Sequence, residues 1–434
     1  MNQPATGDRR AALVRWAGYA LVLLIPFSVY WPLTPPVATG VLPLYVTPSL
    51  YPSDVAVVLL VLADVLVLRR RGLRAWPAHL RPGSRAITLP LLALVSLAWL
   101  TAPTALLPTF AAYSALRWSI SVGVYWALVR ADLPVKRVPV IFLVGLGIHA
   151  LVGVGQVLAQ GPLGLPAELA LAPERSGAAV VAVGGDRWLR AYGLMFHPNV
   201  LGGFLAVGLL ASLPMLGHRA MRLLWWLLWL GLLVSFSRSA WLATAIVLPP
   251  TAGWLVWRQS ALRRPIVMSA VGAALILLIA GLVLGAQVQT RLQLASDASE
   301  SRSLAERGQL LAIALDVIRA HPATGVGAGN FPLALATAPI PMVLQFVHNV
   351  PLLLAAEVGI LGGLLWLWLW LAPALGLERV WRGADPWPVV MTGAWLGLGI
   401  IALWDSYPWT LESGRLLTMM VLALVSRDRS PGSN

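Results

Sequence analysis

The sequence GVGAGNFPLALATAPIPMVLQFVHNVPLLLAAEVGILGG (residues 325–363) ends a long polar interruption in an otherwise apolar chain. The interruption covers residues 291–347, and His348 then opens a new apolar run. Polar and ionisable residues are costly in or beside a bilayer and are usually retained for a function. We therefore expect the chemistry of this chain to lie on this segment.

The composition is typical of a membrane protein. Hydrophobic residues make up 59% of the 434 residues and charged residues 11%, whereas an ordinary soluble domain carries roughly 25% charged residues. Mean hydropathy is +0.79. These values predict an all-α polytopic membrane protein that folds as one integrated helical bundle.

Apolar runs predict about twelve transmembrane helices, because a helix needs roughly 20 apolar residues to cross the hydrocarbon core. Residues 1–287 then hold nine spans, residues 288–347 form a large extracytoplasmic loop with amphipathic helices, and residues 348–434 hold three spans and a short tail. The runs lie near residues 11–30, 54–69, 86–102, 105–129, 138–160, 198–216, 222–237, 239–257, 265–287, 348–376, 387–405 and 412–426.

The basic residues predict how these spans are oriented. Short cytoplasmic loops are enriched in lysine and arginine, and one alternating set of loops and termini collects 21 of the 31 basic residues. This pattern predicts cytoplasmic N- and C-termini and places the polar loop on the outer face. In a bacterial inner membrane, where we expect the protein, that face is the periplasm or exterior. Eight arginines oppose the rule on three outer segments: Arg175, Arg187, Arg190, Arg238, Arg291, Arg302, Arg307 and Arg319.

Several function classes are excluded or disfavoured. The net charge of +14 is spread over short loops, so it fits membrane orientation better than a nucleic-acid surface. The chain has no cysteine, which excludes disulfides and thiol catalysis. The six histidines show no metal-ligand spacing, and no HExxH motif or phosphate-binding Walker loop is present. We expect neither a metal nor a cofactor.

His348 is the candidate general base. Its imidazole titrates near neutrality and could take a proton from an acceptor hydroxyl; a capping or interfacial histidine is the alternative. Glu357 lies nine residues further on, about 13 Å deeper and on another helical face, so we do not expect it to contact His348. Asp405 could orient a base or bind sugar hydroxyls.

Arginines on the outer face are candidate phosphate ligands. That face has no ATP or nucleotide sugar, so an enzyme there needs a pre-activated substrate, such as a lipid-linked diphosphate. The planar guanidinium suits phosphate oxygens. Arg238 is the strongest candidate because so short an outer turn holds its charge near the membrane, whereas Arg190 could equally be an interfacial anchor.

The polar loop itself divides into a helix and a turn. Residues 303–320 predict an amphipathic helix whose apolar stripe is Leu311, Ala314, Leu315 and Ile318. Gly325, Gly327 and Gly329 then form a tight loop whose amides could approach a phosphate, although a plain turn back to the membrane is equally consistent.

Other polar and aromatic residues are expected to be structural. Trp404, Tyr407 and Trp409 predict an aromatic belt at the membrane interface. Asp54 lies near the end of the second span and needs no special role, while Arg117 and Arg415 lie within spans.

Several motifs together resemble the O-antigen ligase family of membrane glycosyltransferases, which includes related O-antigen polymerases. Their order, with a large outer loop before a histidine-asparagine helix, carries the resemblance over roughly residues 190–415. The motifs are Arg190-Ala-Tyr-Gly with Phe196-His-Pro-Asn199, Ser235-Phe-Ser-Arg238-Ser-Ala-Trp241, Glu306-Arg307 through Arg319-Ala-His321-Pro, Gly325-Val-Gly-Ala-Gly-Asn-Phe331, His348-Asn349 through Glu357-Val-Gly, and Asp405-Ser-Tyr-Pro-Trp-Thr.

The resemblance implies a GT-C-like helical fold and a metal-independent, inverting transfer. A glycan would leave an undecaprenyl diphosphate carrier and join a hydroxyl on a lipid core or another glycan, as in lipopolysaccharide and other polysaccharide assembly at the cell envelope. His348 would be the base on the acceptor. Arg190 and Arg238 would hold the diphosphate with help from Arg307, and Asn349, Glu357, His321 and Asp405 could support them.

Two alternatives stay open at this stage. An O-antigen or exopolysaccharide polymerase would use the same donor with another acceptor. A secondary transporter would suit twelve spans, but transporters usually place polar or broken segments at the bilayer midplane in repeated halves. Here the polar residues gather on one face, and no internal repeat is visible.

Overall fold

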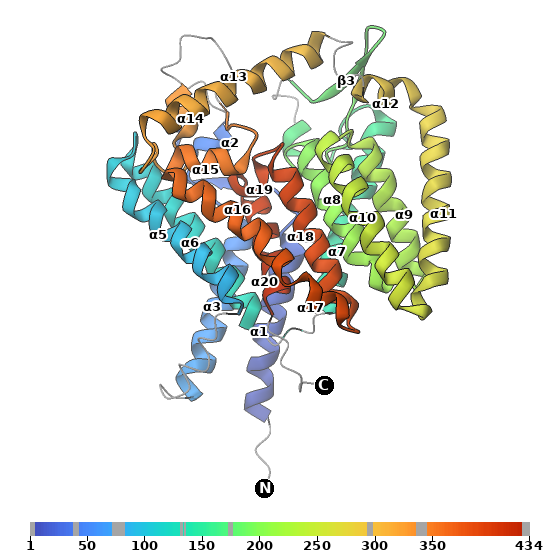
Figure 1. Ribbon diagram of the computed structural model, residues 1–434, viewed down its shortest axis with the longest axis horizontal. Helices are drawn as coiled ribbons and strands as arrows, with labels where there is room; N and C mark the ends of the chain where they lie inside the picture. The colour runs from blue at the N-terminus through green and yellow to red at the C-terminus, as the bar shows by residue number, and fades with distance from the viewer. Residues whose placement is uncertain are drawn as a thin grey trace.

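The computed structural model describes residues 5–37, 43–71, 83–130, 133, 136–171, 177–292, 298–335 and 345–427. Within them the chain forms a bundle of α-helices, with α13 (Ala298–Ala320) across one end and the start of α1 (Ala5–Leu24) at the other (Figure 1). Two small antiparallel sheets pair β1 (Trp31–Pro32) with β2 (Ser49–Leu50) and β3 (Val180–Val183) with β4 (Asp186–Leu189).

Each of the twelve predicted spans contains a helix. In chain order these are α1, α3 (Pro52–Arg71), α5 (Arg85–Thr101), α6 (Pro108–Arg130), α7 (Arg137–Ala159), α8 (Pro198–Ser212), α9 (Arg219–Val234), α10 (Arg238–Arg258), α11 (Ser260–Val283), α15 (Val350–Val358) with α16 (Ile360–Leu375), α18 (Pro386–Ala402) and α20 (Glu412–Ser426). Short helices connect them: α2 (Pro43–Val46), α12 (Gly285–Leu292), α14 (Phe331–Leu335), α17 (Leu377–Arg382) and α19 (Tyr407–Thr410), with 3₁₀ turns at Ala102–Thr104, Leu169–Leu171 and Leu213–Met215.

Among the described residues, five helical segments are long and apolar enough to cross a membrane. They are Arg85–Thr104, Arg137–Ala159, Pro198–Met215, Arg238–Arg258 and Ser260–Val283, and four shorter apolar helices accompany them. The all-α polytopic class is therefore confirmed, and the number of twelve spans stays a prediction.

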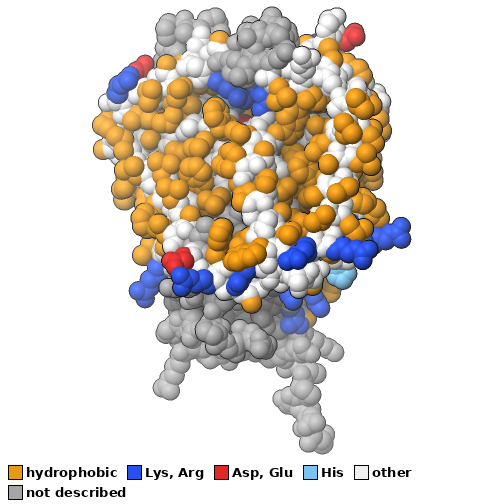
Figure 2. Space-filling model, turned by 45° about the vertical axis from the view of Figure 1, so that its right-hand side comes forward, with side chains coloured by type: hydrophobic (Ala, Val, Ile, Leu, Met, Phe, Trp, Pro, Cys, Tyr) orange, Lys and Arg blue, Asp and Glu red, His pale blue; other side chains and the backbone are white. Residues whose placement is uncertain are grey.

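The flank of the bundle is apolar. Figure 2 shows hydrophobic side chains over the visible flank and a row of basic side chains along the edge at the end where α1 begins. Four large side chains of α11 are 53–78% exposed: Leu278, Ile279, Leu282 and Val283. A belt of this kind fits hydrocarbon, because lipid tails are as apolar as these side chains.

The tenth predicted span is broken, whereas the sequence predicted one helix over residues 348–376. Gly359 has φ +87° and separates α15 from α16. A left-handed residue of this kind ends a helix and favours glycine. The break leaves carbonyl groups at the end of α15 that need hydrogen-bond donors inside the protein.

The glycine-rich loop supplies those donors. The Val326 amide donates to the Ala356 carbonyl at 2.9 Å and the Gly327 amide donates to the Glu357 carbonyl at 2.8 Å. A side chain at Gly325 would collide with the backbone of Glu357. The loop therefore packs against the helix break, which agrees with the plain-turn alternative and uses these amides within the protein.

The buried face of α13 differs from the predicted stripe. Leu310 and Ala314 are fully buried against Phe331 and Leu353, while the predicted core residue Leu311 is 41% exposed. Leu315 is likewise exposed. The helix is therefore confirmed, but its contact face is rotated, because its packing against α14 and α15 buries Leu310 in place of Leu311.

Gly359→Ala should destabilise the protein by about 1–3 kcal/mol, because a Cβ there combines a left-handed backbone with a collision against the Ala323 carbonyl. Gly376→Ala is the matched control, since Gly376 has φ −90° and an added Cβ would lie 3.7 Å from its nearest neighbour. Tryptophan-fluorescence melting in detergent measures both. Equal Tm values for the two variants would contradict this account of the break.

Candidate functional site

A polar cavity of about 440 Å³ lies under α13, where the ends of several helices meet. It brings together four residues that the sequence predicted as a site: Arg190, Arg238, Arg307 and His348. The remaining lining comes from Tyr45, Val180, His197, Asn199, Val200, Arg291, Glu306, Gln345, Asp405, Ser406, Tyr407 and Leu411.

The Asp405 carboxylate is the hub of this cavity. One oxygen, Oδ2, accepts hydrogen bonds from Asn199 Nδ2 at 3.0 Å and from Ser239 Oγ at 3.2 Å. The other, Oδ1, lies 3.4 Å from Nδ1 of His348. Asp405 thus links the start of α8, the start of α10 and His348, which lies two residues before α15.

The second hydrogen-bonding group on Asn199 extends the chain of contacts to Arg190. The Arg190 guanidinium donates to Asn199 Oδ1 and, through Nε, to the Ser235 carbonyl at 2.9 Å. Arg190 is only 5% exposed. It is therefore not a surface anchor, which was the alternative that the sequence left open.

Gln156 of α7 fixes the segment that carries Arg190. Its Oε1 accepts the amides of Tyr192 and Gly193 at 3.0 and 2.9 Å, and its Nε2 donates to the Gly193 carbonyl and to Glu168 at 2.8 Å each. A buried side-chain amide that uses both of its groups in this way is a rigid support.

Arg291 is a cavity residue that the sequence did not single out beyond its place among the outer arginines. Its guanidinium donates through Nε and Nη2 to the Phe236 carbonyl at 3.2 and 3.1 Å. Phe236 has φ +49° in the short turn that Arg238 follows. The charge of Arg291 on α12 is therefore fixed beside the turn between α9 and α10.

His197 and Asn199 also line the cavity, and their motif before the sixth span was their only sequence signal. His197 caps α8, because its Nδ1 accepts the Asn199 amide at 3.1 Å. Burial, reinforced by the nearby charge of Arg190, lowers the pKa of His197 to about 3. The imidazole is neutral at physiological pH and serves as a hydrogen-bond acceptor.

Burial and charge act in opposite directions on Asp405. Burial raises the pKa of its carboxyl, but the nearby imidazole of His348 and the guanidinium of Arg307 outweigh burial and hold the pKa below its usual value. Asp405 is therefore ionised at neutral pH and faces His348 as a carboxylate.

Three other predicted supporting residues lie outside the cavity lining. His321 is exposed at the end of α13. Glu357 is buried in a separate, smaller cavity, where its Oε1 lies 3.4 Å from the Phe331 amide, and it does not contact His348. Asn349 caps α15 and donates to the Leu403 carbonyl at 3.1 Å, so it ties the histidine segment to the chain just before Asp405.

The predicted aromatic belt is wrong for two of its three members. Tyr407 and Trp409 are 5% and 3% exposed, whereas Trp404 is 53% exposed. Tyr407 lines the cavity, and Gly203 of α8 leaves the space that the Tyr407 hydroxyl occupies. Trp409 packs edge-on against Trp118 of α6. The Ser406–Thr410 turn folds into the bundle, so these rings do not reach a membrane interface.

Residues 223–367 match the family model described as O-antigen ligase. The chain contains an O-antigen ligase domain. The match covers α9 to α16 and includes Arg238, Arg291, Arg307 and His348, while Asp405 lies beyond it. The chain has no match among curated proteins.

The O-antigen ligase domain supports a membrane glycosyltransferase of the ligase or polymerase type. It also places the protein in a membrane, in agreement with the apolar helices. A family of this kind implies lipid-linked glycans as its substrates.

His197→Asn should flatten the dependence of Tm on acidic pH. Between about pH 6.5 and pH 3 the unfolded chain protonates His197 and the folded protein does not, so the wild type loses stability as the pH falls. Asparagine keeps an acceptor at the helix cap but does not titrate. Melting at about pH 7 and pH 4.5 should show a smaller loss of Tm in the variant; an equal loss in both proteins would contradict the assignment.

Proposed function

We propose that the protein is an inverting, metal-independent glycosyltransferase that moves a glycan from an undecaprenyl diphosphate carrier to an acceptor hydroxyl, as an O-antigen ligase does. This proposal rests on one observation: His348, Asp405 and four arginines line the same cavity. The arginines are Arg190, Arg238, Arg291 and Arg307. The motif-bearing half of the chain supplies all of them.

His348 is oriented for base catalysis. Its Nδ1 faces the Asp405 carboxylate at 3.4 Å, so the proton of the neutral imidazole belongs on Nδ1 and the lone pair on Nε2. The carboxylate also stabilises the imidazolium that forms when Nε2 takes a proton. Hydrolases that use a histidine base divide the work between histidine and carboxylate in the same way.

The charge of the cavity matches the donor. Among its described residues, four arginines face two carboxylates, Glu306 and Asp405, which leaves two positive charges in excess. A diphosphate esterified at both ends carries two negative charges. Arginine forks can hold these oxygens in pairs, and they stabilise the charge that develops on the leaving group.

The reaction is a single displacement at the anomeric carbon. A bond forms between the acceptor oxygen and this carbon as the bond to the diphosphate oxygen breaks. The acceptor proton moves to Nε2 of His348, and the electron pair of the broken bond leaves with the lipid diphosphate. One displacement inverts the configuration of the anomeric carbon.

We also propose that the cavity opens on the extracytoplasmic side of a bacterial inner membrane, with both termini in the cytoplasm. The basic side chains along the opposite edge of the apolar belt support this orientation (Figure 2). Residues 288–347 then make up the outer segment between spans in residues 1–287 and in residues 348–434, and its described part includes α13, which lines the site through Glu306 and Arg307.

The test is glycan transfer by the purified full-length protein. The donor is a synthetic undecaprenyl diphosphate oligosaccharide, and the acceptors are a lipid A-core glycolipid and a second molecule of the donor. Transfer to the glycolipid in the presence of EDTA supports the proposal, and elongation on the carrier identifies a polymerase. Transfer that requires an added divalent cation, or solute transport by proteoliposomes without glycan chemistry, would overturn it.

His348→Gln should lower kcat by about 10²–10⁴-fold with little change in the KM for the donor, because the base acts on the acceptor in the transition state. His321→Gln is the control, since His321 is exposed at the same end of the bundle. Quantified product over time gives both constants. Full activity of His348→Gln would remove the base assignment.

Arg238→Ala should lower kcat/KM for the donor by about 10²–10³-fold, because it removes one cation that holds the diphosphate. Arg319→Ala is the control, since the Arg319 side chain is 72% exposed and pairs with Asp316 at 2.7 Å. Competition by free undecaprenyl diphosphate measures binding separately from chemistry. An unchanged inhibition constant in Arg238→Ala would contradict a diphosphate contact.

A further inference from the structure

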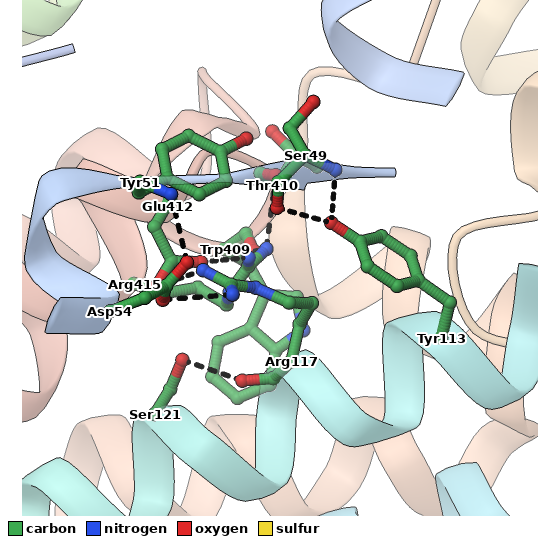
Figure 3. Close-up of polar contacts among 10 residues, drawn as sticks. All are labelled: Ser49, Tyr51, Asp54, Tyr113, Arg117, Ser121, Trp409, Thr410, Glu412 and Arg415. Atoms are coloured by element: carbon green, nitrogen blue, oxygen red, sulfur yellow. Dashed lines mark hydrogen bonds and ion pairs between the residues drawn. The ribbon is translucent and has the colours of Figure 1, made fainter. Parts of the chain in front are cut away.

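A second group of charges lies beside the cavity, buried between three helices. Arg117 of α6 pairs with Asp54 of α3 at 2.9 Å and with Glu412 of α20 at 2.8 Å, and Glu412 pairs with Arg415 at 2.6 Å (Figure 3). The sequence predicted no special role for Asp54 and left Arg117 and Arg415 as isolated charges within spans. The structure joins them in one network.

The network balances two positive and two negative side chains, and none of them lines the catalytic cavity. Arg117, Glu412 and Arg415 are 5–8% exposed. Burying such groups costs free energy that their attraction only partly returns, so a buried ion pair is weak evidence for stability and can instead fix a unique geometry. The geometry that this network fixes follows from its hydrogen bonds to the neighbouring backbone.

The network is hydrogen-bonded to the Asp405–Leu411 turn, which carries the catalytic carboxylate. Nη1 of Arg415 donates to the carbonyls of Trp409 and Thr410 at 3.0 Å each, and Figure 3 shows these contacts beside Arg117 and Glu412. Thr418 of α20 holds the Pro408 carbonyl through Oγ1 at 3.0 Å. These three hydrogen bonds therefore hold the carbonyls of residues 408–410.

The same turn is the floor of the catalytic cavity. Asp405, Ser406, Tyr407 and Leu411 all line that cavity, and they lie immediately on either side of the anchored carbonyls. Glu412 opens α20 directly after Leu411. A shift of the Arg117–Glu412 pair would therefore move Asp405 relative to His348.

A small polar chamber of about 50 Å³ separates the network from Tyr45, which lines both this chamber and the catalytic cavity. Arg117, Thr410 and Arg415 form part of its wall. A space of this size has room for a few water molecules. On one side, the network faces this polar chamber through Arg117 and Arg415. On the other side, Glu412 directly follows the catalytic turn in the chain.

We propose that the Arg117–Glu412 pair is a positioning element of the active site, which holds the Asp405–Leu411 turn so that the Asp405 carboxylate faces His348. The inference rests on the proposed function and deepens it. Arg117 and Glu412 act through Asp405 and touch neither donor nor acceptor.

The test is a double-mutant cycle on kcat. Glu412→Gln, which keeps the shape of the side chain, should lower kcat about tenfold to a hundredfold and change the KM for the donor less than about threefold. In an Asp405→Asn background the same change should alter kcat less than about twofold, because the residue it acts through has already been removed.

Tyr125→Phe is the matched control. Tyr125 Oη contacts Thr88 at 2.8 Å and Ser426 at 2.7 Å, so the variant breaks a buried polar contact between the same helices, α6 and α20, far from the turn. It should lower Tm and leave kcat unchanged. A fall in kcat as large as that of Glu412→Gln would show that any loosening of α6 against α20 has this effect and would overturn the proposal.

Thr418→Val keeps the proposal testable if Glu412→Gln does not fold, because it loosens the same turn without leaving a charge unpaired. It should lower kcat, by a smaller factor, and lose that effect in Asp405→Asn. If the fall in kcat caused by Thr418→Val or Glu412→Gln is equally large in the Asp405→Asn background, the positioning role is overturned. The proposed function is still upheld in that case, provided that the wild type transfers glycan. A wild type without glycan transfer would overturn both.

Discussion

The carboxylate of Asp405 is the contact on which the rest of the site depends. It accepts Asn199 and Ser239 and faces His348, so it joins the ends of helices that are distant in the sequence. A buried carboxylate without such partners would cost several kcal/mol. The apolar bundle therefore holds α8, α10 and the start of α15 against the loop after α18, and His348 faces Asp405 as a result.

The same requirement governs the backbone wherever a helix is interrupted. The carbonyls that end α15 accept the amides of Val326 and Gly327, and the carbonyl of Phe236 accepts Arg291. Irregular backbone within a membrane protein is stable only where protein or a cavity surrounds it. The helix breaks, the glycine loop and the arginine-lined cavity therefore serve the same requirement, which is to give every interrupted backbone group a hydrogen-bond partner.

The sequence was a good guide to the helices and to the charged residues that line the cavity. Apolar runs near twenty residues are long enough to identify helices, and arginines that oppose the orientation rule stood out one by one. Arg190, Arg238, Arg307 and His348 do share a cavity. The break at Gly359, the face of α13 and the inward turn of Trp409 were missed because each depends on contacts with a distant segment. The position of Arg117 within an apolar span shows that its side chain must face the interior of the bundle. It does not show that Asp54 and Glu412 are its partners there.

The order in which the chain is made gives the Asp405 hub a further meaning. Arg190, Arg238, Arg291 and Arg307 all precede residue 308, whereas His348 and Asp405 come with the last helices. A nascent chain that has reached the end of α13 therefore carries all four arginines of the cavity but neither His348 nor Asp405. The cavity that we propose as the active site is therefore completed only when the final helices enter the bundle.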